Sequence, residues 1–364
     1  MTERLDRFRT LLTDHNVDSI VVTHPANRRY LTGYSAHEAL PDTVVGACFI
    51  DADVSRLLTG KTNLDWAKSE AEPHGFVVEG WDRPWSRAIA TEIKSRGWAR
   101  TGFEDGAITV ALYREIVTEL DGASELVPIG QSISYLRRVK DAEEHARYAR
   151  IAQIGDDAFV AATRNLTAGT TERELARRID AELESCGSEG PSFPTIVASG
   201  PHAARPHHDP GDRPIEVGEP IIIDMGAMLD GYHGDLTRTI WVGEPSPRLR
   251  EIYAAVESAQ TAAFAAIRTG VSWDVPDATS RVAVAEAGLS EYLIHGLGHG
   301  VGLNVHELPT MTAGATDVFV GGEITTVEPG LYVPGWGGVR IEDVGVVEAD
   351  GFRLITYAPK ASFA

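Results

Sequence analysis

The sequence predicts a mixed α/β (α+β) protein of two domains, for three reasons. The chain has 364 residues, and a chain of that length most often forms two domains or one large one. Short strand-like segments alternate with helical ones up to about residue 125, which indicates a domain with its own sheet. Longer helical patterns and pairs of apolar strands follow. We expect an N-terminal domain over residues 1–130 and a larger C-terminal domain over residues 140–364.

The N-terminal domain is expected to open with an amphipathic helix, because leucine and phenylalanine recur at helical spacing over residues 5–12. Residues 19–23 form a short β-branched segment that predicts a strand. Two further apolar segments, 44–50 and 54–58, flank an Asp-Ala-Asp turn and predict a hairpin. A helix is expected over residues 87–95.

The C-terminal domain is expected to contain four helices. Residues 141–165 have a strongly helical pattern of alanine, isoleucine and phenylalanine. The segment Thr170-Thr171-Glu172-Arg173-Glu174 is typical of a capped helix start, and predicts a second helix that runs to about Ser185. Two more helical patterns cover residues 247–269 and 276–287.

Apolar runs without helical periodicity predict the strands of this domain. They are residues 195–199, 221–223, 232–242, 324–328 and 339–348. The second and third are joined by a tight turn, and the last two flank a Pro-Gly turn region. We expect each of these pairs to form a hairpin.

Four acidic residues and one histidine interrupt or end these strands or lie in a glycine-rich segment. They are Asp224, Asp235, His299, Glu328 and Glu342. A lone buried acid most often belongs to a salt bridge, because a bare buried charge is very costly. Here hairpin pairing sets Asp224 against Asp235 and Glu328 against Glu342, while the glycines let His299 approach. Convergence of all five predicts a metal site.

Charge balance favours two metal ions over one. Two divalent ions match four carboxylates, whereas one ion leaves about two buried charges uncompensated, each costing several kcal/mol. An oxygen-rich ligand set with one imidazole suits manganese, which we expect first, with cobalt or zinc as alternatives.

Composition excludes some partners. The formal net charge of −20 argues against binding to nucleic acid or to anionic membranes. The two cysteines, Cys48 and Cys186, are far apart and have no metal-ligand spacing, which fits a reducing compartment. No segment approaches the run of about 18 apolar residues that spans a bilayer. We expect a cytoplasmic protein.

Six segments together resemble the M24 metallopeptidases of the creatinase/methionine aminopeptidase superfamily, and most of all the Xaa-Pro dipeptidases (prolidases) and aminopeptidase P. They are Ile223-Asp224-Met225-Gly226, Gly234-Asp235-Leu236-Thr237-Arg238-Thr239, His295-Gly296-Leu297-Gly298-His299-Gly300-Val301-Gly302, Val305-His306-Glu307-Leu308-Pro309, Val327-Glu328-Pro329-Gly330 and Val339-Arg340-Ile341-Glu342-Asp343. The order and spacing of the five ligands also match, and the resemblance covers the whole C-terminal domain.

This resemblance implies the pita-bread fold for residues 140–364 and a creatinase-like N-terminal domain that partly roofs the site and aids homodimer formation. It implies that Asp224 binds the first metal, that His299 and Glu328 bind the second, and that Asp235 and Glu342 bridge both. A bridging hydroxide would then attack the scissile carbonyl.

The resemblance also assigns roles around the metals. His207 and His306 stand where the family binds the substrate carbonyl and the tetrahedral intermediate, and Glu328 where it transfers protons. An exposed loop position is the alternative for His207, with His208 beside it, and a supporting role is the alternative for His306. His295 is expected to hold the glycine-rich loop. Arg340 is a candidate for substrate binding, although its place beside Glu342 better suits a residue that supports a ligand.

The implied reaction is hydrolysis of the bond between an N-terminal residue and proline in dipeptides or short peptides. Proline lacks an amide hydrogen and fixes φ, so such bonds need a dedicated pocket. Thr310 stands where many bacterial prolidases have an arginine for the substrate carboxylate, which leaves longer peptides and non-peptide amides open. Gly234 replaces a common serine, which we expect to matter little. The alternatives are a metal-dependent hydrolase or lyase of a small non-peptide substrate, or a non-catalytic binding module.

Overall fold

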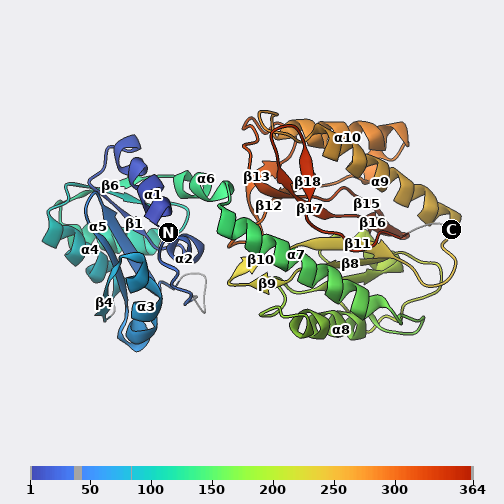
Figure 1. Ribbon diagram of the computed structural model, residues 1–364, viewed down its shortest axis with the longest axis horizontal. Coiled ribbons are helices and arrows are strands. Elements are labelled where there is room, and N and C mark those ends of the chain that lie inside the picture. The colour runs from blue at the N-terminus through green and yellow to red at the C-terminus, as the bar shows by residue number, and fades with distance from the viewer. Residues whose placement is uncertain (1, 37–42, 83, 362–364) are drawn as a thin grey trace. The chain divides into compact units, whose positions relative to one another are not determined.

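The computed structural model describes residues 2–36, 43–82 and 84–361, and the chain divides into two compact units. The first unit is Met1–Arg137 and the second is Arg138–Ala364. In Figure 1 the first unit runs from blue to cyan and the second from green to red. Each unit has its own sheets and core, so each is described by itself.

The N-terminal unit is built on a mixed six-stranded sheet. Its order is β4-β3-β2-β1-β5-β6, in which β1 pairs antiparallel with β2 and parallel with β5. The strands are β1 (Ser19–Val22), β2 (Gly46–Asp51), β3 (Ser55–Gly60), β4 (Val77–Trp81), β5 (Arg100–Phe103) and β6 (Glu125–Pro128). The hairpin predicted around residues 51–53 is confirmed, since β2 and β3 pair antiparallel across it.

Helices cover this sheet. They are α1 (Thr2–Asp14), α2 (Pro25–Thr32), α3 (Leu64–Ala71), α4 (Trp85–Arg96), α5 (Val110–Leu120) and α6 (Ser132–Arg138), with the 3-10 turns η1 (Lys61–Asn63) and η2 (Glu72–His74). Ile89 and Ile93 of α4 and Ile116 of α5 pack on Val21 and Phe49 of the sheet, so these two helices share one face. Burial of such side chains, at about 1.5–3 kcal/mol each, holds this layer in place.

The C-terminal unit has the four predicted helices, α7 (Ala142–Thr163), α8 (Glu172–Ser185), α9 (Pro247–Ala266) and α10 (Asp274–Glu286). Capping boxes start the first two: Asp141 pairs with Glu144, and Thr171 with Glu174. Helix α10 begins at Asp274, two residues before the predicted start at Pro276. A proline is tolerated in the first turn of a helix, because the N–H groups there have no partner within the helix.

The strands of this unit lie between α9 and α10 on one side and α7 and α8 on the other (Figure 1). They form a three-stranded sheet β11-β8-β7, a five-stranded sheet β13-β12-β14-β17-β18, and the pairs β10-β9 and β15-β16. Their bounds are β7 (Ile196–Ser199), β8 (Ile221–Met225), β9 (Met228–Leu229), β10 (Tyr232–His233), β11 (Leu236–Ile240), β12 (Gly298–Gly300), β13 (Glu307–Met311), β14 (Ile324–Val327), β15 (Gly330–Val333), β16 (Gly337–Arg340), β17 (Asp343–Val347) and β18 (Phe352–Leu354), with the 3-10 turns η3 (Gly200–Ala204) and η4 (Ser290–Tyr292).

Two strands predicted as continuous are interrupted. The strand expected over residues 232–242 divides into β10 and β11 around Gly234-Asp235, and the one over 339–348 divides into β16 and β17 around Ile341-Glu342. Hydrophobic alternation cannot reveal such a break, because the apolar residues continue on both sides of it. Within the described ranges, no helix combines the length and apolar character of a membrane span.

Candidate metal centre

Three of the five predicted ligands lie where strands of the C-terminal unit end or break, and the other two lie within strands. Asp224 is one residue before the end of β8, and Asp235 lies in the break between β10 and β11. His299 is the middle residue of β12, Glu328 directly follows β14, and Glu342 lies in the break between β16 and β17. Strand ends, strand breaks and the register shift between His299 and Gly300 loosen the regular pleat, so side chains from separate strands can turn toward one space.

The register corrects one sequence-based expectation. Asp224 pairs with Thr237 across the β8–β11 ladder, so it does not face Asp235 directly. The break at Gly234-Asp235 sets Asp235 just before the ladder begins. In contrast, Glu328 and Glu342 each lie one step beyond the pair formed by Val327 and Asp343, at the same end of β14 and β17.

His299 connects the carboxylates. Its Nε2 lies 3.3 Å from Glu328 Oε1 and 3.7 Å from Asp235 Oδ2. Atoms of Asp235, His299 and Glu342 suited to metal binding all lie within 4.8 Å of one another. The backbone N–H of His299 donates to Thr326 Oγ1, while Nδ1 lies 3.1 Å from the carbonyl oxygen of Gly300. These contacts orient Nε2 toward the acids.

Asp224 and Glu342 are joined by a buried polar chain. Arg340, only 3% exposed, donates from Nη2 to Asp224 Oδ2 at 2.6 Å and from Nε to Thr237 Oγ1 at 3.1 Å. Thr237 in turn donates to Glu342 Oε2 at 2.7 Å, and Arg340 Nη1 donates to the hydroxyl of Tyr332. The donors of Arg340 are therefore used on Asp224, a predicted metal ligand, and on neighbouring hydroxyl groups. This arrangement suits a residue that orients Asp224 better than one that contacts substrate.

Burial and mutual repulsion perturb the acids. Burial, then the neighbouring carboxylates Glu342 and Asp224, raise the pKa of Asp235 well above its usual value. Burial, Glu328 and Asp224 likewise raise the pKa of Glu342 to about 8, and burial raises that of Asp224 although Arg340 opposes it. These carboxylates thus lack sufficient positive charge around them.

Two oxygens of the cluster also lack partners. Among the described residues, no hydrogen-bond donor reaches the buried atoms Asp224 Oδ1 and Glu342 Oε1. A buried carboxylate oxygen without a donor costs about 1–3 kcal/mol or more. Both the unpaired oxygens and the excess negative charge fit divalent cations bound to this donor set.

The pKa shifts of His299 and Glu328 differ from those of the other three carboxylates of the cluster. Burial would lower the pKa of His299, but hydrogen bonding to Glu328 and its charge outweigh burial and raise the pKa to about 9. Burial would likewise raise the pKa of Glu328, yet the bond with His299 holds it below the usual value. Glu328 is thus ionised at neutral pH, as a proton acceptor must be.

Comparison with known proteins assigns the chain to a family. A model described as metallopeptidase family M24 matches residues 146–349, and one described as the creatinase/prolidase N-terminal domain matches residues 4–139. The chain belongs to metallopeptidase family M24. Membership implies that divalent metal ions bind the chain, in agreement with the chemistry of the cluster.

Individual relatives match over nearly their whole length. The Xaa-Pro dipeptidase of Pyrococcus furiosus is 33% identical over 356 residues, which is 98% of each chain. The solved Xaa-Pro dipeptidase from Bacillus anthracis superposes with a TM-score of 0.92 at 32% identity, covering 99% of this chain and 98% of that one. The X-Pro aminopeptidase from Thermotoga maritima gives a TM-score of 0.87 at 28% identity, covering 98% and 99%. The predicted pita-bread fold is confirmed.

The predicted substrate histidines border the M24 centre. His306 is exposed, and its ring centroid lies 4.3 Å from that of His299. Burial, His299 and His207 are among the causes that lower the pKa of His306, which keeps this ring neutral. His207 is exposed and lies within electrostatic reach of both His306 and His295. His295 bonds to Gly296 and Tyr332, as expected of a residue that holds the glycine-rich loop.

Sequence reasoning missed several residues that support the site. Thr237 and Tyr332 complete the chain from Arg340. Thr237 could have been found from its place two residues after Asp235, which puts both side chains on the same side of an extended segment. Gly234 was expected to matter little, but a Cβ there would lie 2.4 Å from Ile151 Cγ2, so this chain has no room for the common serine. Glu172, His202 and His208 form a second polar cluster that the sequence did not indicate.

Proposed function

We propose that this protein hydrolyses the peptide bond between an N-terminal residue and proline in dipeptides or short peptides, with two divalent metal ions. The observation that carries the proposal is the cluster of four carboxylates and one imidazole, with raised pKa values and unpaired oxygens, at the centre of an M24 domain. Full-length relatives named Xaa-Pro dipeptidase support the choice of substrate.

We propose the following division of ligands. Asp224 would hold one ion, His299 and Glu328 would hold the other, and Asp235 and Glu342 would serve both. When bound, the ions supply Lewis-acid polarisation of the scissile carbonyl and lower the pKa of water. Shared carboxylates fit the electrostatics, because Asp235 and Glu342 have the most strongly raised pKa values of the cluster and need the most positive charge.

The other groups of the chain bind substrate and move protons. Neutral His306 can donate an N–H to the carbonyl oxygen without adding charge next to His299, and His207 lies within electrostatic reach of His306. Glu328 would accept the proton of the attacking water and return it to the leaving nitrogen. Arg340 positions Asp224 rather than touching the substrate.

The length of the substrate depends on Thr310. This exposed residue of β13 lies opposite His299 in the β12–β13 register, so it borders the centre. A neutral hydroxyl cannot form the bidentate ion pair by which an arginine recognises a carboxylate. We therefore propose that a free carboxylate directly after proline is not required, and that Xaa-Pro-Xaa peptides are cleaved as well as Xaa-Pro dipeptides.

The conditions of action are also proposals. Manganese suits the oxygen-rich donor set, with cobalt or zinc as alternatives. We propose a homodimer, by likeness to the family, and a cytoplasmic location, since both cysteines are free and Cys48 is buried.

A direct assay tests the function. The purified protein is loaded with Mn²⁺ or Co²⁺, its metal content is measured, and an Xaa-Pro dipeptide is compared with an Xaa-Pro-Xaa tripeptide. We expect two metals per chain and cleavage of both peptides. Two bound metals with cleavage of neither peptide would refute the peptidase and leave the small-molecule hydrolase. Turnover that survives Asp235→Ala without metal would refute the metal mechanism.

A further inference from the structure

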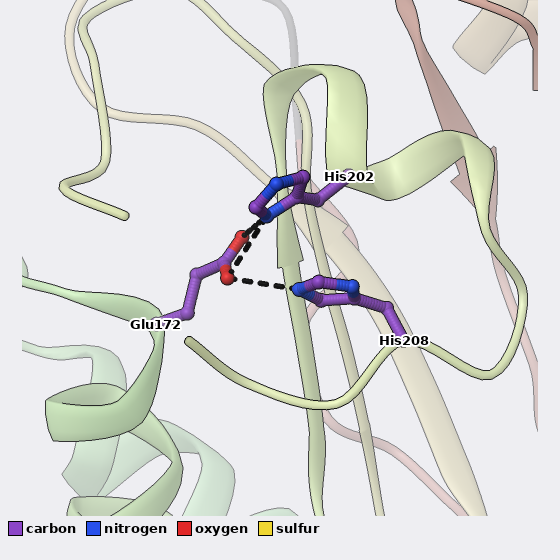
Figure 2. Close-up of side chains that lie close together, drawn as sticks. All are labelled: Glu172, His202 and His208. Carbon is purple, nitrogen blue, oxygen red and sulfur yellow. Dashed lines mark hydrogen bonds and ion pairs between the residues drawn. The ribbon is translucent and has the colours of Figure 1, made fainter. Parts of the chain in front are cut away.

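A second polar cluster lies at the start of helix α8, outside the metal centre. Figure 2 shows the carboxylate of Glu172 facing the rings of His202 and His208. His202 Nδ1 lies 3.0 Å from Oε1, and His208 Nε2 lies 2.9 Å from Oε2. Both histidines come from the loop of residues 200–211, which also carries His207. The cluster therefore connects a helix terminus to the loop with a proposed substrate residue.

The backbone of the same loop is bound to this carboxylate as well. Glu172 is fully buried and accepts hydrogen bonds from the N–H and the hydroxyl of Ser199, both at 2.8 Å, and from the N–H of Gly211 at 3.1 Å. Ser199 directly precedes the loop, and Gly211 is its last residue. One carboxylate thus holds the loop at its start, at its end and at two positions between.

The spacing of Glu172, His202 and His208 would also suit a metal, since the three ligand atoms lie within 4.8 Å of one another. The contacts present already satisfy the carboxylate, since both of its oxygens accept hydrogen bonds from the loop and its flanks. Glu172 occupies the first turn of α8, where unpaired N–H groups favour negative charge. Arg213, which is paired with Glu219, donates to the hydroxyl of Ser199 and so orients one of the donors to Glu172. Burial would raise the pKa of Glu172, but its hydrogen bonds outweigh burial and lower it.

The far side of the loop is attached to the metal centre. Arg340, which binds Asp224, also donates to the carbonyl oxygen of Pro206 at 3.4 Å. The backbone packs closely there: a Cβ on Gly338 of β16 would lie 2.2 Å from the carbonyl oxygen of Ala203. His207 is therefore located between two anchors, Pro206 against Arg340 and His208 against Glu172.

We propose that Glu172, acting through His202 and His208, is the positioning residue for His207, and sets this imidazole at the substrate carbonyl. The inference rests on the proposed function, because it takes His207 as a substrate-binding residue. The carboxylate is bonded to Ser199, His202, His208 and Gly211, so its removal frees several groups together. The loop then samples other conformations, and a misplacement of about 1 Å costs roughly a hundredfold in rate.

The test uses Glu172→Gln, which keeps the shape but turns one acceptor into a donor that faces other donors. In the metal-loaded protein, we expect kcat/KM for an Xaa-Pro peptide to fall about tenfold to a hundredfold, with unchanged metal content. Glu174→Gln is the matched control, because Glu174 caps the same helix through Thr171 and does not touch the loop. His208→Asn serves as a second variant that leaves the buried carboxylate in place.

A double-mutant cycle separates positioning from general destabilisation. If Glu172 acts through His207, then Glu172→Gln has at most a twofold effect in a His207→Ala background. Multiplicative losses in the double variant, or an equal loss from Glu174→Gln, would overturn the proposal. So would a third tightly bound equivalent of Zn²⁺ that disappears in His202→Ala, because it would assign the cluster to a metal.

Hydrogen exchange gives a readout that does not depend on activity. Amides of residues 200–211 should exchange faster in Glu172→Gln and in His208→Asn than in the wild type or in Glu174→Gln. Faster exchange together with a wild type that cleaves no Xaa-Pro peptide would refute the proposed function but keep the anchoring of the loop. Unchanged exchange would overturn the anchoring whatever the activity.

Discussion

Replacement of Glu342 by glutamine should stabilise the metal-free protein at pH 8, although it removes a proposed ligand. Glu342 is 1% exposed, and its pKa is raised to about 8 by burial, then by Glu328 and Asp224. Glutamine keeps an oxygen for the hydroxyl of Thr237, which now donates to Oε2 at 2.7 Å. Its amide can take the place of Oε1, which accepts no hydrogen bond from the described residues, and donate to the neighbouring carboxylates.

The size of the effect follows from the pKa. Because the folded-state pKa exceeds the ordinary value of 4.5, the folded metal-free protein keeps a proton that the unfolded chain releases. The free energy of unfolding therefore falls as pH rises from 4.5 to about 8, by roughly 1.4 kcal/mol per pH unit at most. This sums to about 4–5 kcal/mol, and water entering the site screens part of it, so we expect about 2–4 kcal/mol.

The measurement is urea unfolding of chelator-treated protein at pH 5 and pH 8, with and without added Mn²⁺. The free energy of unfolding of Glu342→Gln should match that of the wild type at pH 5 and exceed it at pH 8. Added Mn²⁺ should raise it less than it raises that of the wild type. Glu348→Gln is the control, since this carboxylate is 45% exposed and paired with Arg353 on the surface. A metal-free Glu342→Gln that is no more stable than the wild type at pH 8 would refute the electrostatic account.

Three further substitutions test the supporting structure. Arg340→Met removes the partner of Asp224, and Mn²⁺ affinity measured by calorimetry should fall about tenfold to a hundredfold; an unchanged affinity would contradict the role. Gly155→Ala should raise the free energy of unfolding by about 0.5–1 kcal/mol, because this glycine is inside α7 and, apart from its chain neighbours and the adjacent backbone of that helix, no described atom lies within 4 Å of the added Cβ. Gly234→Ser should cost about 1–3 kcal/mol by overpacking against Ile151, and Ile151→Ala should restore part of it; thermal unfolding that shows no loss would refute this.

Local chemistry made much of the C-terminal unit predictable. The start of α8 could be placed from Thr171 and Glu174, because a capping box is formed within four residues of the chain. The set of five metal-binding candidates followed from acids and a histidine set into apolar strands, where a charge is too costly without a partner. Charge balance then favoured two ions, although the division of the ligands remains a prediction.

Only the tertiary structure decided how these groups are held. The register sets Thr237, not Asp235, against Asp224, because hydrogen bonding across the ladder and the break at Gly234-Asp235 fix the pairing. Arg340 reaches Asp224 across 116 positions of sequence, and Glu172 reaches His208 across 36. A side chain has no local preference for a partner that distant; packing of the whole unit brings them together. The sequence by itself determined which residues are candidates for the centre, and the tertiary structure determined which residues keep them in place.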